Sequence, residues 1–295
     1  MAQDHPAWVL LGIRRYASLG MALCLAGWHC ATPRDDDGAK AHLAPPRASN
    51  VGLDPNAAWG APAGTVQRVS SHAAEALWSF LPPPTQVRVI VGSGNKVLVH
   101  HQRTEGGAFR IDLTAKGHEW ARLTYQLSHE LCHVSLQYDR DPHSHRWLEE
   151  SVCEAASMRS LVVAADGWAR KPPLSHSAEY HLVFRHYRRR VQGELLPLTQ
   201  SESVDWFSAH RQQLARSPYN RGLNRRVALS LLSLVGDDRG KWEAFLSLNE
   251  GTLPHDSSFE AFLIAWSERV DAHGCRLVVS ISEMLLGAKQ PVSCE

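Results

Sequence analysis

The residues with the clearest chemical potential are two histidines, His129 and His133, which enclose Glu130 in the segment Ser128–His133. On an α-helix, residues i and i+4 lie one above the other on the same face, so both imidazoles can reach one metal ion. Glu130 lies beside them, where its carboxylate can accept a proton from a metal-activated water. The surrounding sequence favours a helix, since it carries an apolar stripe formed by Leu123, Leu127, Leu131 and Leu136. The spacing therefore predicts a metal-binding helix with a general base.

This first pattern needs support from a second one, because the chain contains 17 histidines and such a motif also arises by chance. The alternative is a helix that carries two histidines and binds no metal. A hydrolytic zinc site requires a third protein ligand and an open fourth position. The segment Trp147–Ala156 is rich in helix formers and places Glu149 and Glu150 in its opening turn, followed by Glu154. The sequence therefore predicts a second helix with acidic residues in its opening turns.

Together, the two segments resemble the gluzincins, zinc peptidases of H-E-x-x-H type whose third ligand is a glutamate on the next helix. Their second motif often reads W-L-x-E-G-x-A, and Trp147–Cys153 matches its first half. The resemblance implies Glu150 as the third ligand. Because the later Gly and Ala are missing here, Glu149 stays as the reserve candidate. It also implies that Glu154 hydrogen-bonds to His129 and orients it, the alternative being an ordinary surface glutamate.

The resemblance extends more weakly to two other segments. Tyr219–Gly222 and the apolar run to Val235 are similar to the tyrosine-containing helix of aminopeptidase-type gluzincins, which implies that the Tyr219 hydroxyl stabilises an oxyanion. The alternative for Tyr219 is a packing role. The run Ala108–Leu113 resembles the family's edge strand, which pairs with the substrate backbone. No G-x-M-E-N motif is present, which disfavours an aminopeptidase.

The resemblance implies a zinc-dependent peptidase, with Zn²⁺ bound by His129, His133 and Glu150. Glu130 would accept a proton from the attacking water and deliver it to the departing amine. We expect activity to fall below about pH 6, because both imidazoles must be neutral to bind the metal. The expected partner is a peptide or protein substrate, and a cell-wall peptide is equally open. The alternative is a non-catalytic binding protein of zincin fold that holds a peptide or cell-wall fragment.

The order of elements predicts an α+β fold, because short β-rich runs come first and helical patterns follow. We expect a small, mostly antiparallel sheet packed on a zincin-like helical body, with a mainly α-helical C-terminal part. The expected strands are 86–91, 96–101 and 108–113. The expected helices are 65–81, 118–138, 147–165, 176–191, 202–215, 219–235, 239–248 and 257–272.

The N-terminal segment is typical of an export signal. Arg14 and Arg15 precede an apolar stretch from Tyr16 to about Gly27, which is too short to span a bilayer stably. We expect a signal peptide over residues 1–30, a flexible linker over 31–63 and a peptidase domain over 64–295. Within that domain, residues 64–165 would hold the sheet and active-site helices, and 166–295 a helical subdomain. The alternatives are a buried first helix and a lipoprotein-like anchor.

Export predicts a periplasmic or extracellular protein with no stable membrane span after signal cleavage. The formal net charge of +1 gives no field that favours nucleic acid, so no nucleic-acid partner is expected. Disulfides are permitted in an exported chain, and a bond between Cys275 and Cys294 would tie down the C-terminal tail. Cys132 and Cys153 flank candidate ligands, as small buried residues or as a disulfide.

Overall fold

A computed structural model describes residues 50–83, 87–138, 145–175, 177, 179–251, 257–287, 292 and 294. The signal peptide expected over residues 1–30 lies outside these residues. The linker expected over 31–63 overlaps the folded part, because Val51–Leu53 forms a strand and Trp59 is buried.

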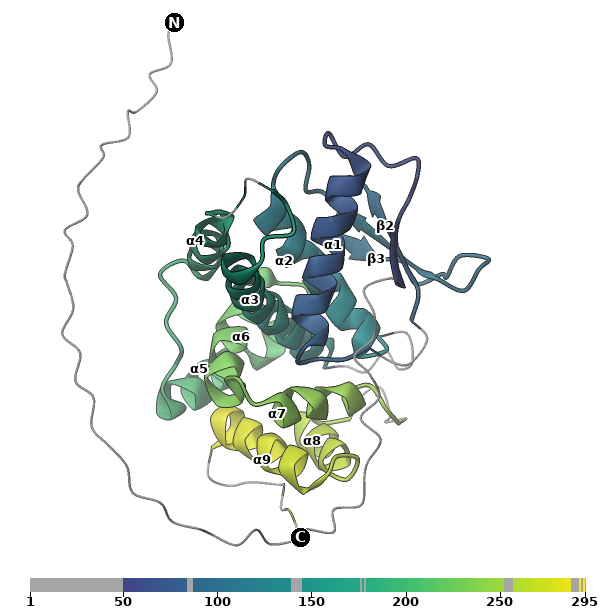
Figure 1. The fold of residues 1–295 in the computed structure, drawn as a ribbon. Helices are drawn as coiled ribbons and strands as arrows, with labels where there is room; N and C mark the ends of the chain where they lie inside the picture. Colours follow the sequence, from purple (N-terminus) through teal and green to yellow (C-terminus); the bar gives the residue numbers. More distant parts are fainter. Residues whose placement is uncertain are drawn as a thin grey trace, which may run out of the picture. The chain divides into compact units, whose positions relative to one another are not determined.

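Among the described residues, four strands form one mixed sheet in the order β1-β2-β4-β3 (Figure 1). The strands are β1 (Val51–Leu53), β2 (Val89–Ser93), β3 (Leu98–Val99) and β4 (Phe109–Leu113). Strand β2 is parallel to both β1 and β4, and only the pair of β3 and β4 is antiparallel. The predicted α+β class is confirmed, but the prediction of a mostly antiparallel sheet was wrong.

Strand β4 lies inside the sheet, between β2 and β3. Its side chains Phe109, Ile111 and Leu113 share one face of the sheet and are all buried, so this face packs against the core. Phe109 lies opposite Val89 of β2, and Ile111 lies opposite Val91. The segment predicted as the edge strand is thus an inner strand. The edge is β3, whose two residues are only half-buried.

Helices cover the sheet and form the rest of the domain (Figure 1). Helices α1 and α2 pack against the strands and against each other, and α3 packs on both of them as well as on α4 and α6. Most boundaries lie close to the predicted ones. The helices are α1 (Ala63–Trp78), α2 (Trp120–Ser135), α3 (Arg146–Arg170), α4 (Tyr180–Gln192), α5 (Gln200–Arg216), α6 (Arg221–Val235), α7 (Arg239–Ala244), α8 (Phe259–Ser267) and α9 (Ala272–Leu286).

Helix α9 was missed in the sequence, where the last helical prediction stopped at residue 272. Asp271 caps this helix by accepting a hydrogen bond from the Gly274 backbone N–H, at 2.8 Å. Leu277, Ile281 and Leu285 form its buried face, which packs on α5, α7 and α8. The mainly helical C-terminal part is confirmed.

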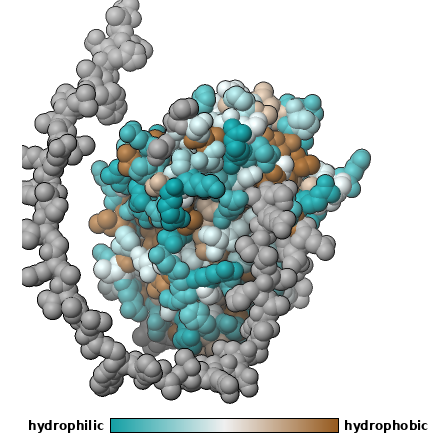
Figure 2. All heavy atoms as spheres, in the orientation of Figure 1, coloured by the Kyte–Doolittle hydropathy of each residue, from teal (hydrophilic) through white to brown (hydrophobic). Residues whose placement is uncertain are grey.

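The face drawn in Figure 2 is mostly hydrophilic, with apolar residues scattered among polar ones. In the part of the chain that the structure describes, no helix combines the length and apolar character needed to cross a bilayer.

The disulfide expected between Cys275 and Cys294 is present, with the two Cα atoms 5.9 Å apart. It joins α9 to a residue 19 positions further along the chain. Closing a loop of this length in the unfolded chain stabilises the native state by about 3 kcal/mol.

We expect Cys294→Ser to lower the free energy of unfolding by about this amount in a denaturant titration under oxidising conditions. The double variant Cys275→Ser/Cys294→Ser is the control, and a clearly larger loss in it would show that packing rather than loop closure dominates.

Candidate metal centre

The site is built where α2 packs on α3. The chain that enters α2 is held by Gln126, whose Oε1 accepts hydrogen bonds from the backbone N–H groups of Thr114 and Ala115 at 3.1 and 3.0 Å. These bonds fix α2 relative to the end of β4. Since α3 begins with buried Trp147 and Leu148, its first turn is anchored in the core, and the glutamates that follow are held against α2.

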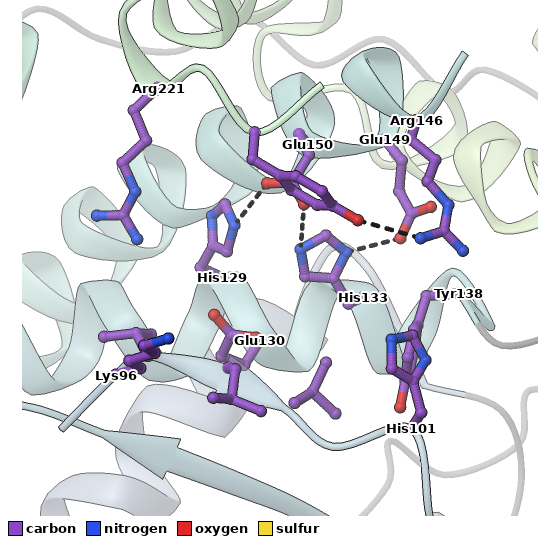
Figure 3. A pocket seen from close by; sticks show the side chains of 14 residues that line it. Lys96, His101, His129, Glu130, His133, Tyr138, Arg146, Glu149, Glu150 and Arg221 are labelled. Atoms are coloured by element: carbon purple, nitrogen blue, oxygen red, sulfur yellow. Dashed lines mark hydrogen bonds and ion pairs between the residues drawn. The ribbon is translucent and has the colours of Figure 1, made fainter. Parts of the chain in front are cut away.

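Three side chains meet at one point between these helices: His129, His133 and Glu150 (Figure 3). Glu150 Oε2 lies 3.3 Å from His129 Nε2, and Glu150 Oε1 lies 3.5 Å from His133 Nε2. One ligand atom from each residue lies within 4.8 Å of the others. This group can hold a metal ion.

The distances fit the chemistry of such a centre. Two ligands bound at about 2.1 Å in tetrahedral geometry lie about 3.4 Å apart, which is close to both carboxylate–imidazole separations. They are longer than a strong charge-assisted hydrogen bond, which is about 2.7–2.9 Å. Two imidazole nitrogens and a carboxylate oxygen suit zinc and several other first-row divalent metals. Glu150, rather than the reserve candidate Glu149, completes the group that could hold a metal ion.

Glu149 has a different position, on the far side of the His133 ring. Its Oε1 lies 2.6 Å from His133 Nδ1, and its Oε2 accepts a hydrogen bond from Asn249 Nδ2 at 3.1 Å. The same Asn249 amide donates to the Leu136 carbonyl at the end of α2. A carboxylate at Nδ1 orients the imidazole and leaves Nε2 free for a metal.

Glu154 lies one turn further along α3, beside the other histidine. Its Oε2 is 4.0 Å from His129 Nδ1, which is beyond hydrogen-bonding distance. The expected hydrogen bond to His129 is therefore absent from this structure. The carboxylate is instead held by the Tyr125 hydroxyl and by Arg225 Nε, the latter at 2.8 Å. Glu154 is buried rather than on the surface.

The charges of the centre are strongly coupled in the metal-free chain. Burial lowers the pKa of His133, but the charges of Glu150, Glu149 and Glu130 and the hydrogen bond to Glu149 outweigh it, so the pKa is raised well above its ordinary value. Burial acts to raise the pKa of Glu150, but His133, His129 and Arg221 lower it to about 2. The raised pKa favours a proton on His133, so a metal ion that binds this ring would have to displace that proton.

A cavity of about 610 Å³ opens onto this group. Glu130 lines it beside both histidines, and so does Tyr219, which is 63% exposed. The Tyr219 hydroxyl accepts a hydrogen bond from Arg146 at 3.1 Å. The structure therefore brings all the residues predicted as ligands, base and oxyanion donor to one cavity.

Cys132 and Cys153 are both buried free thiols on the two facing helices. Burial, reinforced by the neighbouring Cys132, raises the pKa of the Cys153 thiol. They pack between the helices, and neither lines the cavity.

Several residues of the site were not identified from the sequence. Adjacent residues on a helix point about 100° apart, so the pair Glu149–Glu150 contained a signal that only one of them could face the metal. Asn249 and Arg225 gave no such signal, because they come from distant parts of the chain. The Arg146 contact with Tyr219 was likewise not predicted.

Comparisons with protein-family models, with curated proteins and with solved structures found no match to this chain.

We expect Glu149→Ala to weaken metal binding by about 10- to 100-fold, because the His133 ring loses the carboxylate that orients it. Glu149→Gln should recover part of this loss, since its amide oxygen can still accept from Nδ1–H. A competitive chelator titration measures the affinity. The control is Glu194→Ala, which removes an exposed glutamate outside the cavity. Equal affinities for Glu149→Ala and the control would contradict an orienting role.

The raised pKa of His133 predicts a pH effect on the metal-free protein. A proton held more tightly in the folded than in the unfolded chain stabilises the fold fully below the ordinary pKa of 6.5. This contribution is lost as the pH rises through the raised value. The melting temperature of metal-free protein should therefore fall as the pH rises above about 6.5, and less so in His133→Gln. Parallel curves for the two proteins would argue against this assignment.

Proposed function

We propose that this chain is a zinc-dependent peptidase in which His129, His133 and Glu150 hold the metal. The single observation that carries the proposal is the meeting of these three side chains at the wall of an open cavity. Structural zinc sites are closed by four protein ligands, whereas catalytic sites use three and leave one position open. When bound, zinc would polarise the substrate carbonyl and lower the pKa of a water molecule.

Glu130 is the general base in this proposal. Its side chain lies on the cavity wall directly beside both histidines (Figure 3). It is only 4% exposed, and within the described ranges no hydrogen bond or ion pair engages its carboxylate. It is therefore available to accept a proton from the attacking water and to pass it to the departing amine.

The remaining elements of a peptidase site would come from Tyr219 and β3. Tyr219 lines the cavity with its hydroxyl held by Arg146, and we assign it the stabilisation of the oxyanion. The segment Lys96–Val99 lines the same cavity, and within the described residues β3 pairs with β4 alone. The other edge of β3 offers backbone groups to an extended peptide. This role replaces the one expected for the Ala108–Leu113 segment.

The test is Glu130→Gln, which keeps the shape of the side chain and removes the base. Zinc-loaded wild-type protein is first incubated with a tryptic digest of an unrelated protein, with and without a chelator, and new termini are identified by mass spectrometry. We expect Glu130→Gln to retain about one equivalent of zinc while cleavage falls by at least about 100-fold. Glu119→Gln makes the same change at an exposed position just before α2 and should leave cleavage unaffected.

Two results would overturn the proposal. Full activity in Glu130→Gln would show that another group is the base. Chelator-insensitive or absent cleavage by wild-type protein that contains its metal would favour the non-catalytic binding protein instead.

A further inference from the structure

The cavity beside the candidate metal centre gathers three cationic side chains, Lys96, Arg146 and Arg221. They come from separate parts of the chain, namely the loop before β3, the first residue of α3 and the first residue of α6. In Figure 3, Lys96 and Arg221 lie on the His129 side of the histidine pair, and Arg146 lies on the Glu149 and His133 side. The cations therefore flank the point where the bond would be cleaved.

Among the described residues, no carboxylate lies within 4.0 Å of Lys96, Arg146 or Arg221. Lys96 and Arg221 are exposed, whereas Arg146 is half-buried and donates a hydrogen bond to the neutral hydroxyl of Tyr219 at 3.1 Å. By contrast, two other half-buried arginines have a carboxylate partner: Arg159 pairs with Asp237 at 2.7 Å, and Arg225 pairs with Glu154 at 2.8 Å.

The three carboxylates that line the cavity belong to the candidate centre itself. Glu150 contacts both histidines, Glu149 is bound to His133, and Glu130 lies beside them. The three cations match these three carboxylates in number, so a divalent ion would leave the cavity with a net positive charge.

We propose that the substrate is a peptide with a carboxylate group close to the scissile bond, and that this group is bound by Arg146 or by Arg221, according to the side of the bond on which it lies. The inference rests on the proposed peptidase function and names its substrate class. A guanidinium binds a carboxylate through two parallel hydrogen bonds, which gives both affinity and orientation. The carboxylate is either the C-terminus of the peptide or an acidic side chain. Because the arginines lie on both sides of the centre, they could bind a carboxylate from either source.

The test compares four forms of one peptide that the wild-type protein cleaves. They carry a free or an amidated C-terminus, combined with Glu or Gln beside the cleaved bond. We expect at least one carboxylate form to exceed its neutral counterpart by about tenfold or more in kcat/KM, the usual effect of a charged hydrogen bond. Which form is preferred identifies the source of the carboxylate.

The arginines are assigned by substitution. Arg146→Gln or Arg221→Gln should bring the acid-to-neutral ratio close to one, and the corresponding Lys variant should restore part of it because the charge remains. The matched control is Arg216→Gln, an exposed arginine at the end of α5 outside the cavity, which should keep the wild-type ratio. Circular dichroism and zinc content establish that each variant is folded.

A binding measurement separates this inference from the peptidase proposal. Zinc-loaded Glu130→Gln is immobilised, and its retention of a tryptic digest is compared with retention of the same digest after methyl esterification of all carboxylates. Selective retention of the free acids, lost on adding Arg146→Gln or Arg221→Gln, supports the inference even if wild-type protein cleaves nothing. Equal retention and equal cleavage of acid and neutral forms would overturn it and leave the peptidase standing. An acid preference that no arginine variant alters overturns the assignment to these residues.

Discussion

The contact of Glu150 with His129 and His133 is the interaction on which the site depends. It exists because α2 and α3 pack closely enough to bury both imidazoles, and this burial removes the imidazoles and the carboxylate from most of the water that would solvate them. Each charged group is then stabilised mainly by the other charged groups of the site. The carboxylate compensates the cost of a protonated imidazole in the metal-free chain, and a divalent cation would compensate the same carboxylate more fully. The same three side chains could therefore hold either a proton or a metal ion.

The neighbouring carboxylates extend this reasoning outward. Both imidazoles direct Nε2 toward Glu150, and each has a glutamate near Nδ1, Glu149 at 2.6 Å and Glu154 at 4.0 Å. The two arrangements are unequal. Glu149 acts on its histidine directly, whereas Glu154 is occupied by Tyr125 and Arg225 and faces His129 only as a nearby charge. The His133 ring is therefore the more tightly fixed of the two, and the His129 ring depends more on Glu150 itself.

The sequence was sufficient for the parts of the site that lie within one helix. The spacing of His129 and His133 sets their common face, and the resemblance of Trp147–Cys153 to the gluzincin motif pointed to Glu150, with Glu149 in reserve, as the candidate third ligand. The sequence was not sufficient where distant segments meet. The sheet was expected to be mostly antiparallel, yet β2 pairs in parallel with β4, and β3 lies at the edge. The order of the strands depends on contacts between distant segments of the chain, which local patterns do not encode.

The helical C-terminal part of the chain also supplies residues that hold the site in place, a contribution that local sequence patterns did not reveal. Asn249, which follows α7, binds Glu149 and the end of α2 together, and Arg225 on α6 holds Glu154. Arg221 and Tyr219 reach the cavity from the start of α6. Residues after 166 therefore position the carboxylates that residues before 166 contribute. Since a buried carboxylate without these partners would lose its orientation and much of its stabilisation, the centre requires both parts of the domain to fold as one unit. A separate C-terminal subdomain, useful as a description of the sequence, does not describe how the site is held together.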